Sequence, residues 1–287
     1  MPVPTSRIAI DLSGSLLRVV DGTLGGTMRC GSGGTPSGSL VDGRIMDVGG
    51  VSNALRALLA RAEIRGTRAL IAVSDALASF RVLKFPADAT DQAIDSATTK
   101  ELPADPDRMA SWWTDVHQDG HGRVVFAAVW DRNLVKRAAD VARGAGLEPT
   151  VVELKSLCIA RAVTEPSCVV VDISASPVEI FVIDHHVPQV WHSFELTVPA
   201  GEDIGPALVV PLRQVLRFYG RRRDVDFRAT SPILIAGDQT VSSQTFSYLE
   251  EVLGHPVASL VAPPRVPEDV RHGTYLTCLG MLMRRSS

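Results

Sequence analysis

Two short segments of the chain carry residues whose types and spacing could hold a charged ligand. Asp11 begins the run Asp-Leu-Ser-Gly-Ser, and Asp172 begins the run Asp-Ile-Ser-Ala-Ser. Each aspartate follows a short apolar segment, and a second apolar segment follows each run of small residues. A strand that delivers an aspartate to such a turn can present backbone N–H groups and hydroxyls outward, an arrangement suited to phosphates.

One such run by itself is ordinary turn chemistry. The two runs, however, are separated by more than half of the 287 residues, which indicates an internal duplication. Two such hairpins facing each other across a cleft could cradle a polyphosphate from both sides. The candidate residues are Asp11, Ser13, Gly14, Ser15, Asp172, Ser174, Ala175 and Ser176. Asp11 and Asp172 would each hold a magnesium ion through water.

Apolar periodicity predicts the elements that position these turns. Strands are expected at residues 8–10, 16–20, 69–73, 80–85, 124–129, 150–154, 169–171, 179–183, 189–194, 233–236 and 257–261. Helices are expected at residues 51–62, 131–146, 155–163, 204–219, 245–253 and 274–283. Pro206 and Pro211 are expected to confine the regular part of the helix at 204–219 to its end. Alternating strands and helices predict α/β layers.

Composition narrows the class of protein. The chain is 45% hydrophobic, has a net charge of −3 and carries no sustained block of basic residues, so a nucleic-acid surface is not expected. The arginines at 221–223 form a short run that is better interpreted as a helix cap than as a phosphate site. The cysteines have no Cys-x-x-Cys spacing, which predicts reduced thiols and no zinc site. Without a signal pattern or a long apolar stretch, a cytosolic location is expected, with membrane contact only through partners.

The paired hairpins resemble the phosphate-1 and phosphate-2 motifs of the actin/Hsp70 superfamily. Ala236-Gly237-Asp238, after the strand at 233–236, resembles its adenosine motif. Within the superfamily, the chain looks most like the PilM family of type IV pilus assembly proteins, relatives of the division protein FtsA. The stretches that carry this resemblance are residues 41–47, 83–86, 102–103, 144–149, 216–219 and 277–281.

The resemblance implies an α/β, actin-like (ribonuclease H-like) duplicated two-lobe fold with an inserted 1C-type subdomain and a reduced 2B region. The first lobe (1A) would cover residues 1–166, with the 1C-like insert at about 74–147. The second lobe (2A, with a minimal 2B) would cover residues 167–287. The closing helix at about 274–283 would return to the first lobe.

The sequence departs from the family pattern at several places. Ser13 and Ser174 stand where family members usually have glycine, and Arg18 stands where they have the phosphate-1 lysine. Asp238 replaces the second glycine of the adenosine motif. Residues 197–232 form only a short stretch where PilM-like proteins place subdomain 2B.

The resemblance implies a cytoplasmic scaffold of a type IV pilus or secretion machine, peripheral to the inner membrane. Its partner would be the cytoplasmic tail of a PilN-like membrane protein, bound between the first lobe and the insert near residues 73–147. ATP and magnesium would bind between the lobes, with Arg18 near the phosphates and Gly237 and Asp238 near the adenosine. The nucleotide could then close the cleft and shift the groove.

Two alternatives stay open. The first is a scaffold without nucleotide, like the cytoplasmic domain of the type II secretion protein GspL, which the departures favour. The second is an active ATPase or phosphotransferase, which needs a base or water-holding residue that the sequence does not place. Hydrolysis is therefore not expected.

Two further motifs have competing interpretations. His185-His186 could bind a metal, but no further ligand is placed by spacing, so a hairpin tip is favoured. Trp112-Trp113 could anchor a partner. The favoured interpretation is that one tryptophan packs inside the insert and the other covers its edge.

Overall fold

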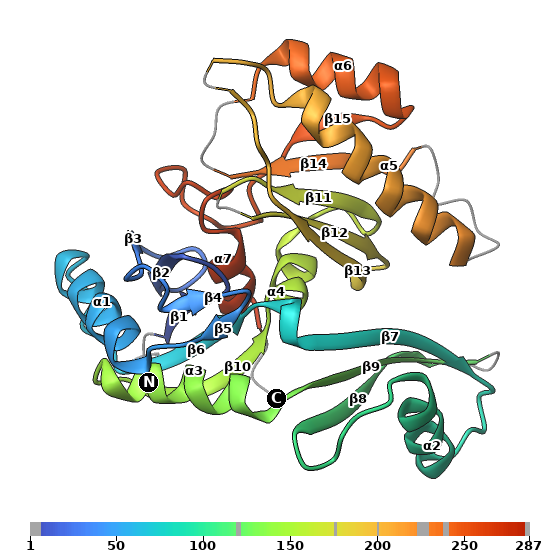
Figure 1. The fold of residues 1–287 in the computed structure, drawn as a ribbon, viewed down its shortest axis with the longest axis horizontal. Helices are drawn as coiled ribbons and strands as arrows, with labels where there is room; N and C mark the ends of the chain where they lie inside the picture. The colour runs from blue at the N-terminus through green and yellow to red at the C-terminus, as the bar shows by residue number, and fades with distance from the viewer. Residues whose placement is uncertain are drawn as a thin grey trace.

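Two five-stranded sheets form the frame of the molecule (Figure 1). The computed structural model describes residues 7–118, 122–174, 177–199, 201–222, 230–237 and 241–284. The first sheet has the order β10 (Glu148–Leu154), β6 (Arg68–Val73), β1 (Arg7–Asp11), β2 (Leu16–Gly22) and β3 (Met28–Gly34). The second has the order β13 (Val187–Phe194), β12 (Val178–Asp184), β11 (Cys168–Asp172), β14 (Ile233–Ala236) and β15 (Val257–Ser259).

The two sheets have the same connectivity. In each, three antiparallel strands are followed by two parallel strands, so β1, β2, β3, β6 and β10 correspond in order to β11, β12, β13, β14 and β15. The register also corresponds, because Asp11 lies opposite Arg18 and Asp172 lies opposite Glu179. The internal duplication predicted from the two aspartate turns is therefore confirmed.

Helices cover both faces of each sheet (Figure 1). On the outer faces, α1 (Val48–Arg61) and α3 (Arg132–Gly144) pack on the first sheet, and α5 (Gly205–Arg222) and α6 (Ser243–Leu253) pack on the second. Between the sheets, α7 (Leu276–Leu282) packs on the first sheet and α4 (Lys155–Ala162) on the second. We call the first sheet with α1 and α3 the first lobe, and the second sheet with α5 and α6 the second lobe.

The alternation of side chains along the central strands explains these layers. Ile8 and Ile10 of β1 point into the core shared with α1 and α3, whereas Ala9 belongs to the core shared with α7. Val169 and Val171 of β11 pack with α5 and α6, whereas Val170 packs with α4. Strands that are buried on both faces read as continuous apolar runs, which is why these strands could be predicted.

A third sheet lies beside the first lobe and is inserted between β6 and α3 (Figure 1). Its order is β7 (Ala78–Phe85), β9 (Arg123–Asp131) and β8 (Met109–Gln118), and it follows the short 3-10 helix η1 (Asp75–Leu77). We call this sheet, together with α2 (Asp91–Glu101), the insert. The elements α2 and β8 were not predicted. Helix α2 buries only Ile94 and Thr98, so its sequence has little apolar periodicity.

Helix α5 corrects one prediction. It runs through both prolines, so the expectation that Pro206 and Pro211 confine the regular helix to its end is wrong. Pro206 lies in the first turn, where its missing N–H is not needed. Pro211 lies inside the helix, and the burial of Leu208 and Leu212 against the second sheet offsets its cost.

The remaining boundaries differ by a few residues. Helix α1 begins at Val48 because Asp47 caps it, accepting a hydrogen bond from Gly50 N at 2.9 Å. Strand β3 was not among the predicted strands, and it pairs along β2. The second sheet begins at Cys168, beside the proposed division at residues 166 and 167, which stays a prediction.

Candidate functional site between the two hairpins

The two aspartate turns are built in the same way. At the end of β1, Asp11 Oδ1 accepts hydrogen bonds from Ser13 N at 2.9 Å and from Ser13 Oγ at 2.5 Å. At the end of β11, Asp172 Oδ1 accepts from Ser174 N at 3.0 Å and from Ser174 Oγ. Each carboxylate therefore holds its own turn through the serine that replaces the expected glycine.

Arg18 joins one hairpin to the other. Its side chain is buried, and Nη1 lies 3.5 Å from Asp11 Oδ2. Its Nη2 donates to the carbonyl oxygen of Ser174 at 3.0 Å and to Ser174 Oγ at 2.7 Å. Since β2 belongs to the first sheet and Ser174 follows β11 of the second, this guanidinium spans the cleft.

The second hairpin carries two carboxylates, and Lys155 lies between them. The position equivalent to Arg18 is Glu179, which lies opposite Asp172 in the register. Lys155 Nζ lies 2.7 Å from Asp172 Oδ2 and 2.5 Å from Glu179 Oε2. Trp191 Nε1 donates to the other Glu179 oxygen at 2.8 Å. A buried charge needs such pairing, because unpaired burial costs several kcal/mol, on the order of 3–5.

Electrostatic interactions keep both Lys155 and Asp172 ionised. Burial by itself lowers the pKa of Lys155, but Asp172 and then Glu179 raise it well above its usual range. Burial raises the pKa of Asp172, but Lys155 and then Arg18 outweigh this and lower it to about 2. Both groups are therefore charged throughout the physiological pH range.

A third buried carboxylate lies next to this network. Asp75, the first residue of η1, accepts hydrogen bonds from Ser156 Oγ at 2.5 Å and from Ser156 N at 3.0 Å. Burial, its largest influence, raises the pKa of Asp75 to about 7, the hydrogen bond from Ser156 opposes this, and the charge of Glu179 adds to it. The contact anchors the start of α4 to the segment that leads into the insert.

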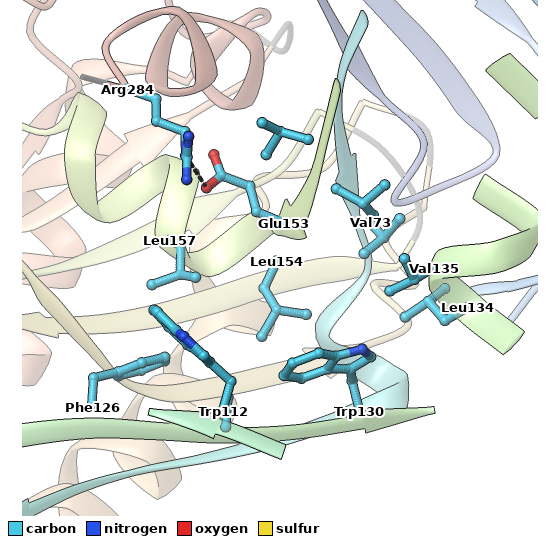
Figure 2. Close-up of a pocket in the computed structure, with 13 residues that line it drawn as sticks. Val73, Trp112, Phe126, Trp130, Leu134, Val135, Glu153, Leu154, Leu157 and Arg284 are labelled. Carbon is cyan, nitrogen blue, oxygen red and sulfur yellow. Dashed lines mark ion pairs between the residues drawn. The ribbon is translucent and has the colours of Figure 1, made fainter. Parts of the chain in front are cut away.

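An apolar groove separates the insert from the first lobe (Figure 2). Its volume is about 320 Å³, and its lining residues are Val73, Trp112, Phe126, Ala128, Trp130, Leu134, Val135, Val151, Val152, Glu153, Leu154, Leu157 and Arg284. Trp112, Phe126 and Trp130 rise from β8 and β9 on one side, opposite Leu154 and Leu157. Glu153 and Arg284 form an ion pair of 3.7 Å at its edge.

The two tryptophans of the insert face opposite sides of its sheet. Trp113 packs with Leu102 and Val129, and its Nε1 donates to Asp95 Oδ1 at 2.6 Å, so it lies under α2. Trp112 is 49% exposed and lines the groove. The expectation that one member of the pair packs inside the insert is thus confirmed, and the other faces a groove.

Comparison with solved structures decides the fold. A structure described as a PilM-PilN type IV pilus biogenesis complex matches with a TM-score of 0.75 and 19% identity, over 96% of this chain and 97% of that one. The ethanolamine utilization protein EutJ from Carboxydothermus hydrogenoformans matches with a TM-score of 0.55 and 14% identity, over 99% and 90%. The cytoplasmic domain of EpsL, an inner-membrane component of the Vibrio cholerae type II secretion system, matches with a TM-score of 0.55 and 9% identity, over 98% and 96%.

The chain has the actin-like ATPase fold. This confirms the fold class that the paired hairpins predicted, and the arrangement is PilM-like over nearly the whole chain. No protein-family model matches the sequence, and a search of curated proteins finds no match.

The cleft between the Asp11 and Asp172 hairpins can be tested for its fit to a magnesium ion. Asp11 is 1% exposed and Asp172 is 7% exposed, and the oxygens of both are already engaged by serines and cations. A divalent cation here would face Lys155 Nζ and the Arg18 guanidinium at short range, where like charges repel. The described residues therefore do not fit a magnesium ion held through these two aspartates.

The predicted adenosine motif lies where the backbone of Gly237 closely approaches the backbone of Ser174 in the second hairpin. Gly237 has a φ of +135°, and a Cβ there would lie 2.7 Å from Ser174 N. A polar pocket of about 400 Å³ opens beside it and is lined in part by His272, Gly273 and Phe246. Ala175, Ser176 and Asp238 lie outside the described residues, as do the side chains of residues 221–223.

The structure also shows the surroundings of the remaining residues that the sequence singled out. A Cβ built on Gly14 would have no heavy atom within 4 Å. The carbonyl oxygen of Ser15 accepts hydrogen bonds from the backbone N and from Oγ1 of Thr35. His185 and His186 have φ values of 53° and 59°, as a hairpin tip requires. Within the described ranges, no group of three or more metal-binding side chains occurs, and no helix is long and apolar enough to cross a membrane.

Sequence reasoning missed Lys155, Glu179 and Asp75. Arg18 lies seven residues after Asp11, and the same offset from Asp172 leads to Glu179, so the duplication contained a signal for the second carboxylate. No signal of that kind marks Lys155, which the sequence shows only as the first residue of a helix.

Proposed function

We propose that this chain is a non-catalytic scaffold of a type IV pilus or secretion machine that binds an apolar segment of a membrane protein's cytoplasmic tail. The observation that carries the proposal is the groove between the insert and the first lobe, where Trp112 and Trp130 stand opposite Leu154 and Leu157. The similar structure described as a PilM-PilN complex supports a PilN-like partner. The EpsL likeness supports a secretion role.

The groove suits an extended peptide with apolar side chains. Trp112 offers a large flat surface that is half exposed, and buried aromatic anchors dominate many interfaces. Phe126 and Ala128 form a buried floor. The Glu153–Arg284 ion pair at the edge offers polar contacts to the peptide backbone or to a charged residue of the tail. The scaffold would work in the cytoplasm, reaching the inner membrane through this partner.

Of the two scaffold versions, the one without nucleotide has the better support. Lys155 and Arg18 already neutralise the carboxylates that would organise magnesium. An ATPase or phosphotransferase has less support, because Asp11 and Asp172 are both buried and engaged.

Trp112→Ala should weaken tail binding by about tenfold or more, because the indole is a central contact of the groove. The probe is the synthetic cytoplasmic tail of a PilN-like membrane protein from the same genome, titrated against the purified protein by calorimetry. The unfolding midpoint should change little, since the side chain is 49% exposed.

Phe218→Ala is the matched control. It removes an aromatic side chain of nearly equal exposure, 48%, from α5 of the second lobe, and this side chain is not among those that line the groove. Equal loss of affinity in both variants, or no loss in Trp112→Ala, would refute the groove as the binding site.

A further inference from the structure

The duplicated hairpins carry opposite charges at equivalent positions. Arg18 lies opposite Asp11 in the first hairpin, and Glu179 lies opposite Asp172 in the second. The first hairpin is thus charge-balanced by its own residues, whereas the second holds two carboxylates. The second hairpin needs a cation from elsewhere, because two buried carboxylates side by side cannot both stay ionised without one.

Lys155 is that cation, and it comes from α4 rather than from the hairpin. Its Nζ touches one oxygen of Asp172 and one of Glu179, at 2.7 and 2.5 Å. The Lys155 side chain is only 3% exposed, so water contributes little to its charge balance. A bound metal ion held by the same two oxygens would have to take the place of this ammonium group.

We infer that Lys155 is a built-in cation that takes the role of a divalent metal in this cleft and, with Arg18, holds the two hairpins together without a ligand. Arg18 supplies the direct link, through Ser174 of the second hairpin. Lys155 supplies the second link, since the next residue, Ser156, is bonded to Asp75 of the first lobe's connection to the insert. The cleft is then a fixed joint, and neither magnesium nor ATP is needed to close it. This inference does not depend on the groove or on its peptide.

The first test is the thermal unfolding of the full chain with and without millimolar Mg-ATP. The wild-type midpoint should stay unchanged, because the carboxylates of Asp11 and Asp172 are already engaged by serines and by the two cations. An increase of several degrees with Mg-ATP would overturn the inference.

The second test removes the charge of Lys155 while keeping most of the length of its side chain. Lys155→Met should lower the midpoint by about 10 °C, because it leaves Asp172 and Glu179 buried without their counter-ion. Millimolar CaCl2 or MnCl2 should restore part of this loss in the variant and change nothing in the wild type. A variant as stable as the wild type, or one whose midpoint no divalent cation raises, would refute the metal-like role.

The matched variant is the double substitution Lys155→Met with Glu179→Gln. The glutamine keeps an oxygen for Trp191 Nε1 and can donate to Asp172, so one carboxylate and one cation are removed together. Its midpoint should return to within a few degrees of the wild type and should not respond to metals. If Lys155→Met does not fold, a folded double variant supports the inference. Two variants that both fail to fold would overturn it, since lost packing alone would then explain the effect.

Discussion

Gly280→Ala is expected to lower the free energy of unfolding by about 3 kcal/mol, because the residue lies where α7 crosses α4 at backbone contact. A Cβ at Gly280 would lie 1.9 Å from the carbonyl oxygen of Cys158 and 3.1 Å from its Cα. Backbone atoms cannot rotate away as a flexible side chain can, so the two helices would have to separate. Urea unfolding at neutral pH measures the loss.

The crossing matters because it lies between the two sheets. Cys158 and Leu279 belong to the core that α7 shares with the first sheet, and Arg161 Nη1 donates to the Gly280 carbonyl oxygen at 2.7 Å. Separation of α4 from α7 would therefore loosen both the core and the helix that carries Lys155. The Arg18 and Lys155 contacts across the cleft should weaken with it.

Gly220→Ala is the control for helix propensity. Gly220 lies in α5, and no heavy atom lies within 4 Å of a Cβ placed on it. Alanine there should be neutral or add stability of up to about 1 kcal/mol. A loss below about 1 kcal/mol in Gly280→Ala would show that the helices are not in close contact.

The second large effect is a pH dependence that arises from Asp75. Its pKa in the folded state, about 7, lies above the ordinary value of 3.8, so the folded state holds a proton that the unfolded chain releases. The stabilising contribution is fully present below pH 3.8 and is lost as the pH rises through 7. Within that window the loss is about 1.4 kcal/mol per pH unit, which gives a total of about 4 kcal/mol.

Asp75→Asn should remove this dependence. Its amide can donate to Ser156 Oγ while its oxygen accepts from Ser156 N, so both hydrogen bonds of the protonated acid are kept without the charge. We expect the variant to match the wild type near pH 4 and to exceed its unfolding free energy increasingly as the pH rises to 8. Urea unfolding across this range, with the difference between the two curves taken at each pH, measures the effect.

Asp42→Asn is the matched control. Asp42 lies in an exposed turn with a φ of 47°, a conformation that asparagine also tolerates. Its difference curve against the wild type should be flat. An Asp75→Asn curve that is equally flat would mean that the buried carboxyl does not take up a proton on folding.

The duplicated α/β architecture could be predicted from the amino-acid sequence. Strands that are buried on both faces appear in the sequence as continuous apolar runs. Where such a run ends in an aspartate followed by small residues, these few neighbouring residues are enough to predict a turn. Because Asp11 and Asp172 share this local pattern, the two hairpins and their duplication could be predicted. The same locality explains why α2 was missed, since its few buried residues, such as Ile94, leave almost no periodic signal.

Which charges meet in the cleft, and where the groove lies, depends on how the layers pack against one another. Arg18 bonds Ser174 across the two sheets, and Lys155 reaches Asp172 and Glu179 from a helix that precedes them. The groove likewise combines the side of the insert that carries Trp112 with residues of β10 and α4. These contacts join elements whose separation depends on how the layers pack, and a local pattern carries no information about the distance between such layers. The same residue types thus permitted a magnesium site in the sequence, and the packing of α4 put a lysine in its place.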